Sequence, residues 1–175
     1  VITQPSTDGV AFRIVQRGTE GHTIDQGLKR MAIEAGVEIH YGTRREPGDC
    51  HIVAAGPRES SAVAFGEIFH TDHPNHVTFQ LNDKLAPGAY SYLIVIDGIG
   101  LICTCLWRQQ RKSTRYLNET IAWYEQHYDL NRRPIKRVGG KGDFGLPTRY
   151  VHEGRYYVGE AGGLQDFMWG FGMRY

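Results

Sequence analysis

Arg155-Tyr-Tyr-Val158, rich in β-branched and aromatic residues, predicts a short strand, and the chain continues as Gly159-Glu-Ala-Gly-Gly-Leu164. Side chains this small let a flat ligand or a phosphate approach the main chain closely. A second pair of glycines, in Gly170-Phe-Gly172, predicts the start of a helix. A strand, an acid, a small-residue loop and a helix start are the parts of a nucleotide site at the carboxyl end of a strand. The alternative is an ordinary glycine-rich loop.

This segment resembles the second flavin motif of FAD-dependent oxidoreductases of the geranylgeranyl reductase and aromatic hydroxylase type. That motif reads roughly Val-Gly-Asp-Ala-Ala-Gly, followed after a short run by Gly-x-Gly-Ile at a helix start. Here Glu160 stands for the Asp, Gly162 for an Ala, and Phe167 for the usual Pro. The resemblance implies that Glu160 binds a ribityl hydroxyl and that main-chain amides face the N1 edge of the flavin. The implied cofactor contacts in this segment are Gly159, Glu160, Ala161, Gly162, Gly163, Gly170, Gly172 and Met173.

The composition is that of an ordinary soluble globular protein. The chain has 175 residues, 41% hydrophobic and 22% charged, with a formal net charge of +1. This balance gives no reason to expect a nucleic-acid partner, and we expect no metal site, since the histidines and three cysteines show no metal-ligand spacing. No apolar run is long enough for a transmembrane helix, and we expect a reducing, cytoplasmic location.

The first part of the chain predicts an α/β unit. We expect a strand over Val10–Val15, a helix over Ile24–Ala35 with Thr23 as its N-cap and Gly36 as its stop, and a strand over Val37–Tyr41. The resemblance extends here to an Arg-Gly loop before an Ile-Asp pair. It implies that Arg17 lies near the mouth of the flavin cavity; the alternative is a surface charge.

A second small-residue turn follows a short apolar run. Cys50–Ala55 predicts a buried parallel strand interrupted only by His51, which we expect to be a polar edge or a satisfied core residue. In the flavoprotein family this strand passes beside the dinucleotide, so the resemblance adds Ala55, Gly56 and Pro57 to the cofactor contacts. The order of the two motifs along the chain is also that of the family.

Between the two motifs the sequence predicts an antiparallel sheet and one helix. The expected strands are 62–65, 77–81, 90–96 and 101–107, and Asp97-Gly98 predicts a tight hairpin. Ser113 is the expected N-cap of a helix over Thr114–His127 whose aromatic stripe is a packing face. Cys103 and Cys105 should be small buried thiols on one side of their strand.

Part of this insert resembles a family pattern near the flavin face, Pro-x-x-Tyr-x-Trp-x-Phe-Pro. Pro87 and Tyr90 match it, while Tyr92 replaces the Trp and Ile94-Val95 replace Phe-Pro. The resemblance implies an aromatic wall for an apolar substrate, which we assign to Tyr90, Tyr92 and Trp169. The alternative is that the two tyrosines are simply one face of a strand. Tyr90 is a poor proton donor unassisted, and no side chain is assigned as catalytic.

Together these patterns predict an α/β protein with an α+β insert. The resemblance implies that residues 1–60 and 138–175 form part of a Rossmann-like FAD-binding domain, with residues 61–137 as an inserted substrate-binding layer. The Gly-x-Gly-x-x-Gly turn that holds the pyrophosphate in the family precedes the segments matched here, and the glycine-rich stretches of this chain do not supply a substitute. We therefore expect a fragment of a longer protein that binds FAD weakly or not at all by itself. The implied activity is a reductase or dehydrogenase passing hydride through flavin N5, with NAD(P)H as donor; the alternatives are a flavin monooxygenase and a non-catalytic binding module.

Overall fold

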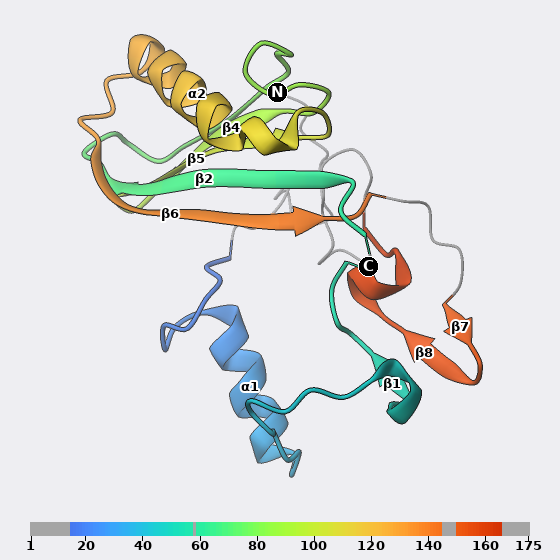
Figure 1. Cartoon of the computed structure of the whole chain (residues 1–175). Coiled ribbons are helices and arrows are strands. Elements are labelled where there is room, and N and C mark those ends of the chain that lie inside the picture. Colours follow the sequence, from blue (N-terminus) through green and yellow to red (C-terminus); the bar gives the residue numbers. More distant parts are fainter. Residues whose placement is uncertain (1–14, 58, 145–149, 166–175) are drawn as a thin grey trace, which may run out of the picture. The chain divides into compact units, whose positions relative to one another are not determined.

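The computed structural model describes residues 15–57, 59–144 and 150–165. The chain divides into two compact units, Val1–Glu46 and Pro47–Tyr175, and each is considered by itself. In the described part of the first unit the regular element is helix α1 (Ile24–Glu34). The second unit holds two β-sheets and helix α2 (Figure 1). The molecule is therefore of mixed α/β type, as the sequence predicts.

Helix α1 begins and ends where its sequence signals lie. Thr23 is the N-cap, with its hydroxyl accepting a hydrogen bond from the Gln26 amide at 3.4 Å. Gly36 follows the last turn with φ of +83°, a conformation that favours glycine. The apolar stripe remains in solvent, since Leu28 is 58% and Met31 65% exposed.

The strand predicted over Val37–Tyr41 is wrong. These residues are irregular, and Val37, Ile39 and Tyr41 are all exposed. A strand needs a neighbour for its main-chain donors and acceptors, and the described residues of this unit supply none. The strand expected over Val10–Val15 lies outside the described residues except for Val15, which is not in a strand.

Five antiparallel strands form the larger sheet, in the order β3-β4-β5-β2-β6 (Figure 1). Their bounds are β2 (Ala62–His70), β3 (His76–Gln80), β4 (Ser91–Ile96), β5 (Ile99–Leu106) and β6 (Arg133–Gly142). The predicted hairpin is confirmed: Ile96 pairs with Ile99, and Asp97 and Gly98 have φ of 48° and 79°. Two consecutive positive φ values are the mark of the type I′ turn that Asp-Gly favours.

Helix α2 (Ser113–His127) packs across one face of this sheet (Figure 1). Its buried residues Leu117, Ile121 and Tyr124 meet the strands over a core that also contains Phe69, Leu93, Val95, Ile102 and Leu130. Ser113 is not the N-cap as expected. The 3-10 turn η2 (Gln110–Lys112) runs directly into the helix, so Ser113 already has helical φ and ψ of −53° and −40°.

The sequence predicted one strand of this sheet too short and did not predict another. Strand β2 continues past Phe65 to His70 because it pairs with β5 over this whole length. Gly66 allows a close approach to β5, since a Cβ atom there would lie 2.8 Å from the Ile102 carbonyl oxygen. Strand β6 pairs with β2 along its length, although its glycines and charges give no strand signal. Residue 138, where a return to the flavin-binding segment is expected, lies inside β6; the domain assignment itself stays a prediction.

A buried charge stabilises the junction of β2 and β6. Glu67 is 6% exposed and forms ion pairs with Arg132 and with Arg137, its partner in the strand register. Arg132 also pairs with Glu125 of α2, at 2.8 Å. A charge taken this far out of water needs such partners, so the cluster fixes β6 and the end of α2 against β2.

The smaller sheet has the order β1-β8-β7, with bounds β1 (Ile52–Val53), β7 (Val151–His152) and β8 (Arg155–Tyr157). β1 and β8 are parallel, so the predicted direction of the strand in Cys50–Ala55 is confirmed. Its predicted burial is not: Val53 is 7% exposed, but Ile52 is 62% exposed because only one face of the strand is covered. His51 lies at the exposed start of this strand, and its carbonyl accepts the Tyr156 amide at 2.9 Å.

A substitution at Gly100 tests the packing of the larger sheet. A Cβ atom there would lie 2.3 Å from the ring of Phe69, which is fully buried. We expect Gly100→Ala to lower the free energy of unfolding by about 1–3 kcal/mol, because the ring has to move within a filled core. Gly140→Ala in β6 is the matched control, since no atom lies within 4 Å of its added Cβ. Urea denaturation measures both, and equal losses would contradict this account of the core.

Candidate functional site

The two small-residue turns of the second unit follow the carboxyl ends of two neighbouring strands in the smaller sheet. We call this end of the sheet the sheet edge. Strands β1 and β8 run side by side until the Val158 amide donates to the Val53 carbonyl at 3.0 Å. Ala54 directly follows Val53, and Gly159 directly follows Val158. The parallel pairing therefore brings Ala55, Gly56 and Pro57 to the same sheet edge as Gly159–Gly163, although the two groups lie far apart in the sequence. Their role in cofactor binding stays a prediction.

Two glycines expose main chain at this edge. Gly56 and Gly159 have φ of +78° and +57°, and no atom lies within 4 Å of the position of a Cβ at either residue. Glycine is favoured at both places because a side chain would be strained there. The absence of side chains leaves space in which a ligand could approach each backbone.

The other small residues of the second turn are required by the fold of the turn itself. Residues Gly159–Gly162 form the 3-10 turn η3, in which Ala161 is 4% exposed. At Gly162 a Cβ would lie 2.5 Å from the Tyr157 carbonyl oxygen. Gly163 has φ of +73° and donates its amide to the Glu160 carbonyl at 3.0 Å. These residues pack the turn against the end of β8.

Glu160 contacts the end of the larger sheet. Its side chain is half-buried, and Oε1 accepts the main-chain N–H of Asp143 at 2.8 Å. Asp143 is the first residue after β6. One oxygen of the carboxylate thus has a protein donor, while a carboxylate can accept about four hydrogen bonds in all.

Sequence reasoning missed the corner that receives Glu160. The Phe144 amide donates to Ser61 Oγ at 2.7 Å, and the Gln110 side-chain amide donates to the Ser61 carbonyl at 2.8 Å. The Phe144 ring lies 5.8 Å from that of Trp107, centroid to centroid. These residues come from separate turns and share no motif, so no signal in the sequence joins them.

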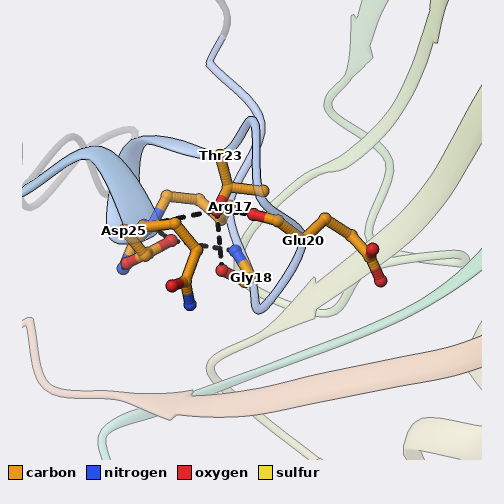
Figure 2. A network of polar contacts seen from close by, with 6 residues as sticks. Arg17, Gly18, Glu20, Thr23 and Asp25 are labelled. Atoms are coloured by element: carbon orange, nitrogen blue, oxygen red, sulfur yellow. Dashed lines mark hydrogen bonds and ion pairs between the residues drawn. The ribbon is translucent and has the colours of Figure 1, made fainter. Parts of the chain in front are cut away.

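Arg17 lies in a closed loop before α1 in the first unit (Figure 2). Its guanidinium donates to both carboxylate oxygens of Asp25, at 2.7 and 2.8 Å, and the Gly18 amide donates to Asp25 at 2.8 Å. Thr23 Oγ1 lies 2.8 Å from the carbonyl oxygens of both Gly18 and Glu20. The pairing gives Arg17 a structural role in this loop, and its predicted place at a flavin cavity stays a prediction.

Tyr90 and Tyr92 are neighbours on the face of the larger sheet opposite α2. Their ring centroids are 6.2 Å apart, and Phe79 lies 6.1 Å from the first and 5.7 Å from the second. Cys103 and Cys105 are buried on the same side, so the prediction of buried thiols is confirmed. Burial raises the pKa of the Tyr92 hydroxyl, which therefore remains protonated at neutral pH.

Four predicted site residues belong to the segment after Gln165. Trp169, Gly170, Gly172 and Met173 lie outside the described residues.

Within the described ranges, no three or more His, Cys, Asp or Glu side chains gather closely enough to hold a metal ion. The helices of the described part are also too short or too polar to span a membrane.

No family model and no curated protein matches the sequence. A solved structure is similar in fold: a geranylgeranyl bacteriochlorophyll reductase-like protein from Thermoplasma acidophilum, with a TM-score of 0.58 and 21% sequence identity. The match covers 70% of this chain and 36% of that chain, so this chain spans about a third of the similar protein. At this identity the likeness shows the fold.

Gly162 can be tested as a glycine that the fold requires. Gly162→Ala should lower the free energy of unfolding by about 1–3 kcal/mol, because its methyl group would meet the Tyr157 carbonyl. Gly48→Ala in the same unit is the control, since its nearest atom lies 3.9 Å away in the flexible Arg155 side chain. Chemical denaturation distinguishes them; a Gly162→Ala variant as stable as the control would show that the close packing is absent.

The Arg17–Asp25 pair predicts an unusual titration. The hydrogen bonds from Arg17, and then from the Gly18 amide, lower the pKa of Asp25 from 3.8 to about 2. Because the pKa is lowered in the folded chain, the stabilisation is complete above pH 3.8 and is lost as the pH falls through 2. We expect carboxyl-carbon NMR to give a midpoint near 2 that moves toward 3.8 in Arg17→Gln.

Asp72 provides the internal reference for this titration. Hydrogen bonds from Arg133 and Asn131 lower its pKa, and neither partner is changed by the substitution at Arg17. Its midpoint should therefore be the same in both proteins. If Arg17→Gln left the Asp25 midpoint unchanged, the two hydrogen bonds from Arg17 to the Asp25 carboxylate would not form in solution.

Proposed function

We propose that this chain is part of an FAD-dependent oxidoreductase that transfers hydride to or from an apolar organic substrate, with NAD(P)H as the electron donor. The observation that carries the proposal is the parallel pairing of β1 with β8, which places two glycine turns with open main chain at one sheet edge. Nucleotide cofactors bind at such edges in open α/β sheets. The fold likeness to a geranylgeranyl bacteriochlorophyll reductase-like protein supports the same class.

The residues at this edge fit a flavin nucleotide. Gly56 and Gly159 leave space above their backbones, so a flat group or a phosphate can contact bare main chain. The Glu160 carboxylate is within the same turn and keeps accepting capacity beyond its bond to Asp143. Gly162 contributes shape only, because the Tyr157 carbonyl already occupies the space in front of it.

Each group then has a defined task. Gly56 and Gly159 admit the cofactor to the backbone, and Glu160 orients it through a hydroxyl of its sugar-alcohol chain. A bound flavin would supply hydride transfer, which no protein side chain can perform. The aromatic rings of Phe79, Tyr90 and Tyr92 give an apolar substrate a surface on which to pack and exclude water.

No described side chain is assigned as a proton donor. The raised pKa of Tyr92 makes its hydroxyl a weak acid at neutral pH, so it serves as a packing and hydrogen-bonding group. The tyrosines accordingly act by binding and orienting the substrate.

The test is the visible spectrum of purified protein. We expect the product of the whole gene that encodes this chain to carry FAD in a stoichiometric amount, and residues 1–175 alone to carry little or none. Gly159→Ala in the whole gene product should weaken FAD binding by about tenfold or more, since a methyl group would enter the space left at that turn. Fluorescence titration of the deflavinated protein measures this, with Gly140→Ala as the control variant.

The outcomes separate the competing functions. Colourless whole-gene product that takes up no FAD would overturn the proposal and favour a non-catalytic binding module. A flavoprotein that oxidises NAD(P)H and hydroxylates its substrate with oxygen would be a monooxygenase. One that reduces a substrate double bond without oxygen would be the proposed reductase.

A further inference from the structure

Glu160 joins the proposed cofactor turn to the end of the larger sheet. It lies in η3, which is separated from the end of β8 by one residue, yet its Oε1 accepts the amide of Asp143, the first residue after β6. β6 is an edge strand of the sheet that carries the aromatic patch of Phe79, Tyr90 and Tyr92. One carboxylate thus joins the proposed cofactor turn to the sheet that carries this patch, at the edge opposite the patch.

The local packing leaves room for this contact. At Gly142, the last residue of β6, a Cβ atom would lie 3.4 Å from Glu160 Oε1 and 3.1 Å from the Phe144 ring. A larger residue there would press on both groups. The corner is also held from its other side, by the bond from the Phe144 amide to Ser61 Oγ.

The length of the Glu160 side chain explains its departure from the resembling motif, which has Asp. A carboxylate on a chain one methylene shorter could not reach the Asp143 amide without movement of the turn. The longer chain satisfies this amide, which otherwise follows the last paired residue of β6. The second oxygen, Oε2, lies outside this hydrogen bond and retains its own lone pairs.

We propose that Glu160 couples cofactor binding to the order of the Asp143–Phe144 corner. Oε1 accepts the hydrogen bond from the Asp143 amide, while Oε2 accepts one from a hydroxyl of the bound flavin nucleotide. When the nucleotide is bound, the carboxylate and the Asp143–Phe144 corner are therefore held in one position together. Coupling of this kind is reciprocal. The factor by which FAD binding favours the ordered Asp143–Phe144 corner is therefore also the factor by which an ordered corner tightens FAD binding. This inference rests on the proposed function, since the ligand at Oε2 is the flavin nucleotide.

Two substitutions separate the two oxygens. Glu160→Asp keeps the negative charge but shortens the side chain, so the Asp143 amide should lose its partner. Glu160→Gln keeps an acceptor for that amide but removes the charge, so FAD affinity should fall about tenfold while the corner stays ordered. Ser61→Ala is the control, because it frees the Phe144 amide and leaves the carboxylate intact.

Amide hydrogen exchange at Asp143 is the main measurement, made on the whole gene product with and without FAD. In the unchanged protein we expect exchange at Asp143 to slow by about fivefold or more when FAD is added, within the usual range of coupling between sites. In Glu160→Asp it should be fast and unresponsive to FAD. In Ser61→Ala, FAD should still slow exchange at Asp143.

The results distinguish this coupling from the proposed function. Tight FAD binding with unchanged Asp143 exchange would overturn the coupling and leave the flavoprotein assignment intact. Fast Asp143 exchange confined to Glu160→Asp, with FAD slowing it in the unchanged protein, would support it. Absence of FAD binding in the unchanged protein would overturn both.

Discussion

The parallel pairing of β1 with β8 is the constraint on which the proposed site depends. It is short, yet it joins two segments separated in the sequence by the whole five-stranded sheet. Its register, Val53 opposite Tyr157, makes both strands end together, so the chain leaves them at the same level, through Ala54 on one and Val158 on the other. A shift of one residue would move one turn along the edge and reverse the side on which Val53 is buried.

The glycines of this region serve two different purposes. Gly162 is small because the Tyr157 carbonyl lies against it, and its identity would be required in a protein that bound nothing. Gly56 and Gly159 have positive φ with open space in front of them, so a ligand can approach the main chain at both positions. A glycine-rich sequence therefore marks a close approach of backbone, and only the structure tells whether the approaching group belongs to the chain.

Local signals predicted the elements that local chemistry determines. Thr23 and Gly36 mark the two ends of α1, and Asp97-Gly98 forms the type I′ turn. Each of these features depends only on a few neighbouring residues. Pairing with distant segments was not visible. β6 is a strand because β2 lies beside it, and Val37–Tyr41 alternates as a strand should but has no partner among the described residues. The candidate turns could be found by motif, whereas the Glu160–Asp143 contact joins residues that no pattern relates.

The arrangement of these pairings also implies an order of folding. The β4–β5 hairpin closes over two residues, and such hairpins form within about 1–10 μs. The β1–β8 pair must wait until the intervening chain has been brought back, and the entropy of closing that loop makes it a late event. During synthesis the β1 segment, with Ile52 facing solvent, thus leaves the ribosome long before its partner exists. The edge proposed to receive the cofactor is consequently assembled last, and a newly made chain passes through a stage with a finished sheet and an incomplete nucleotide edge.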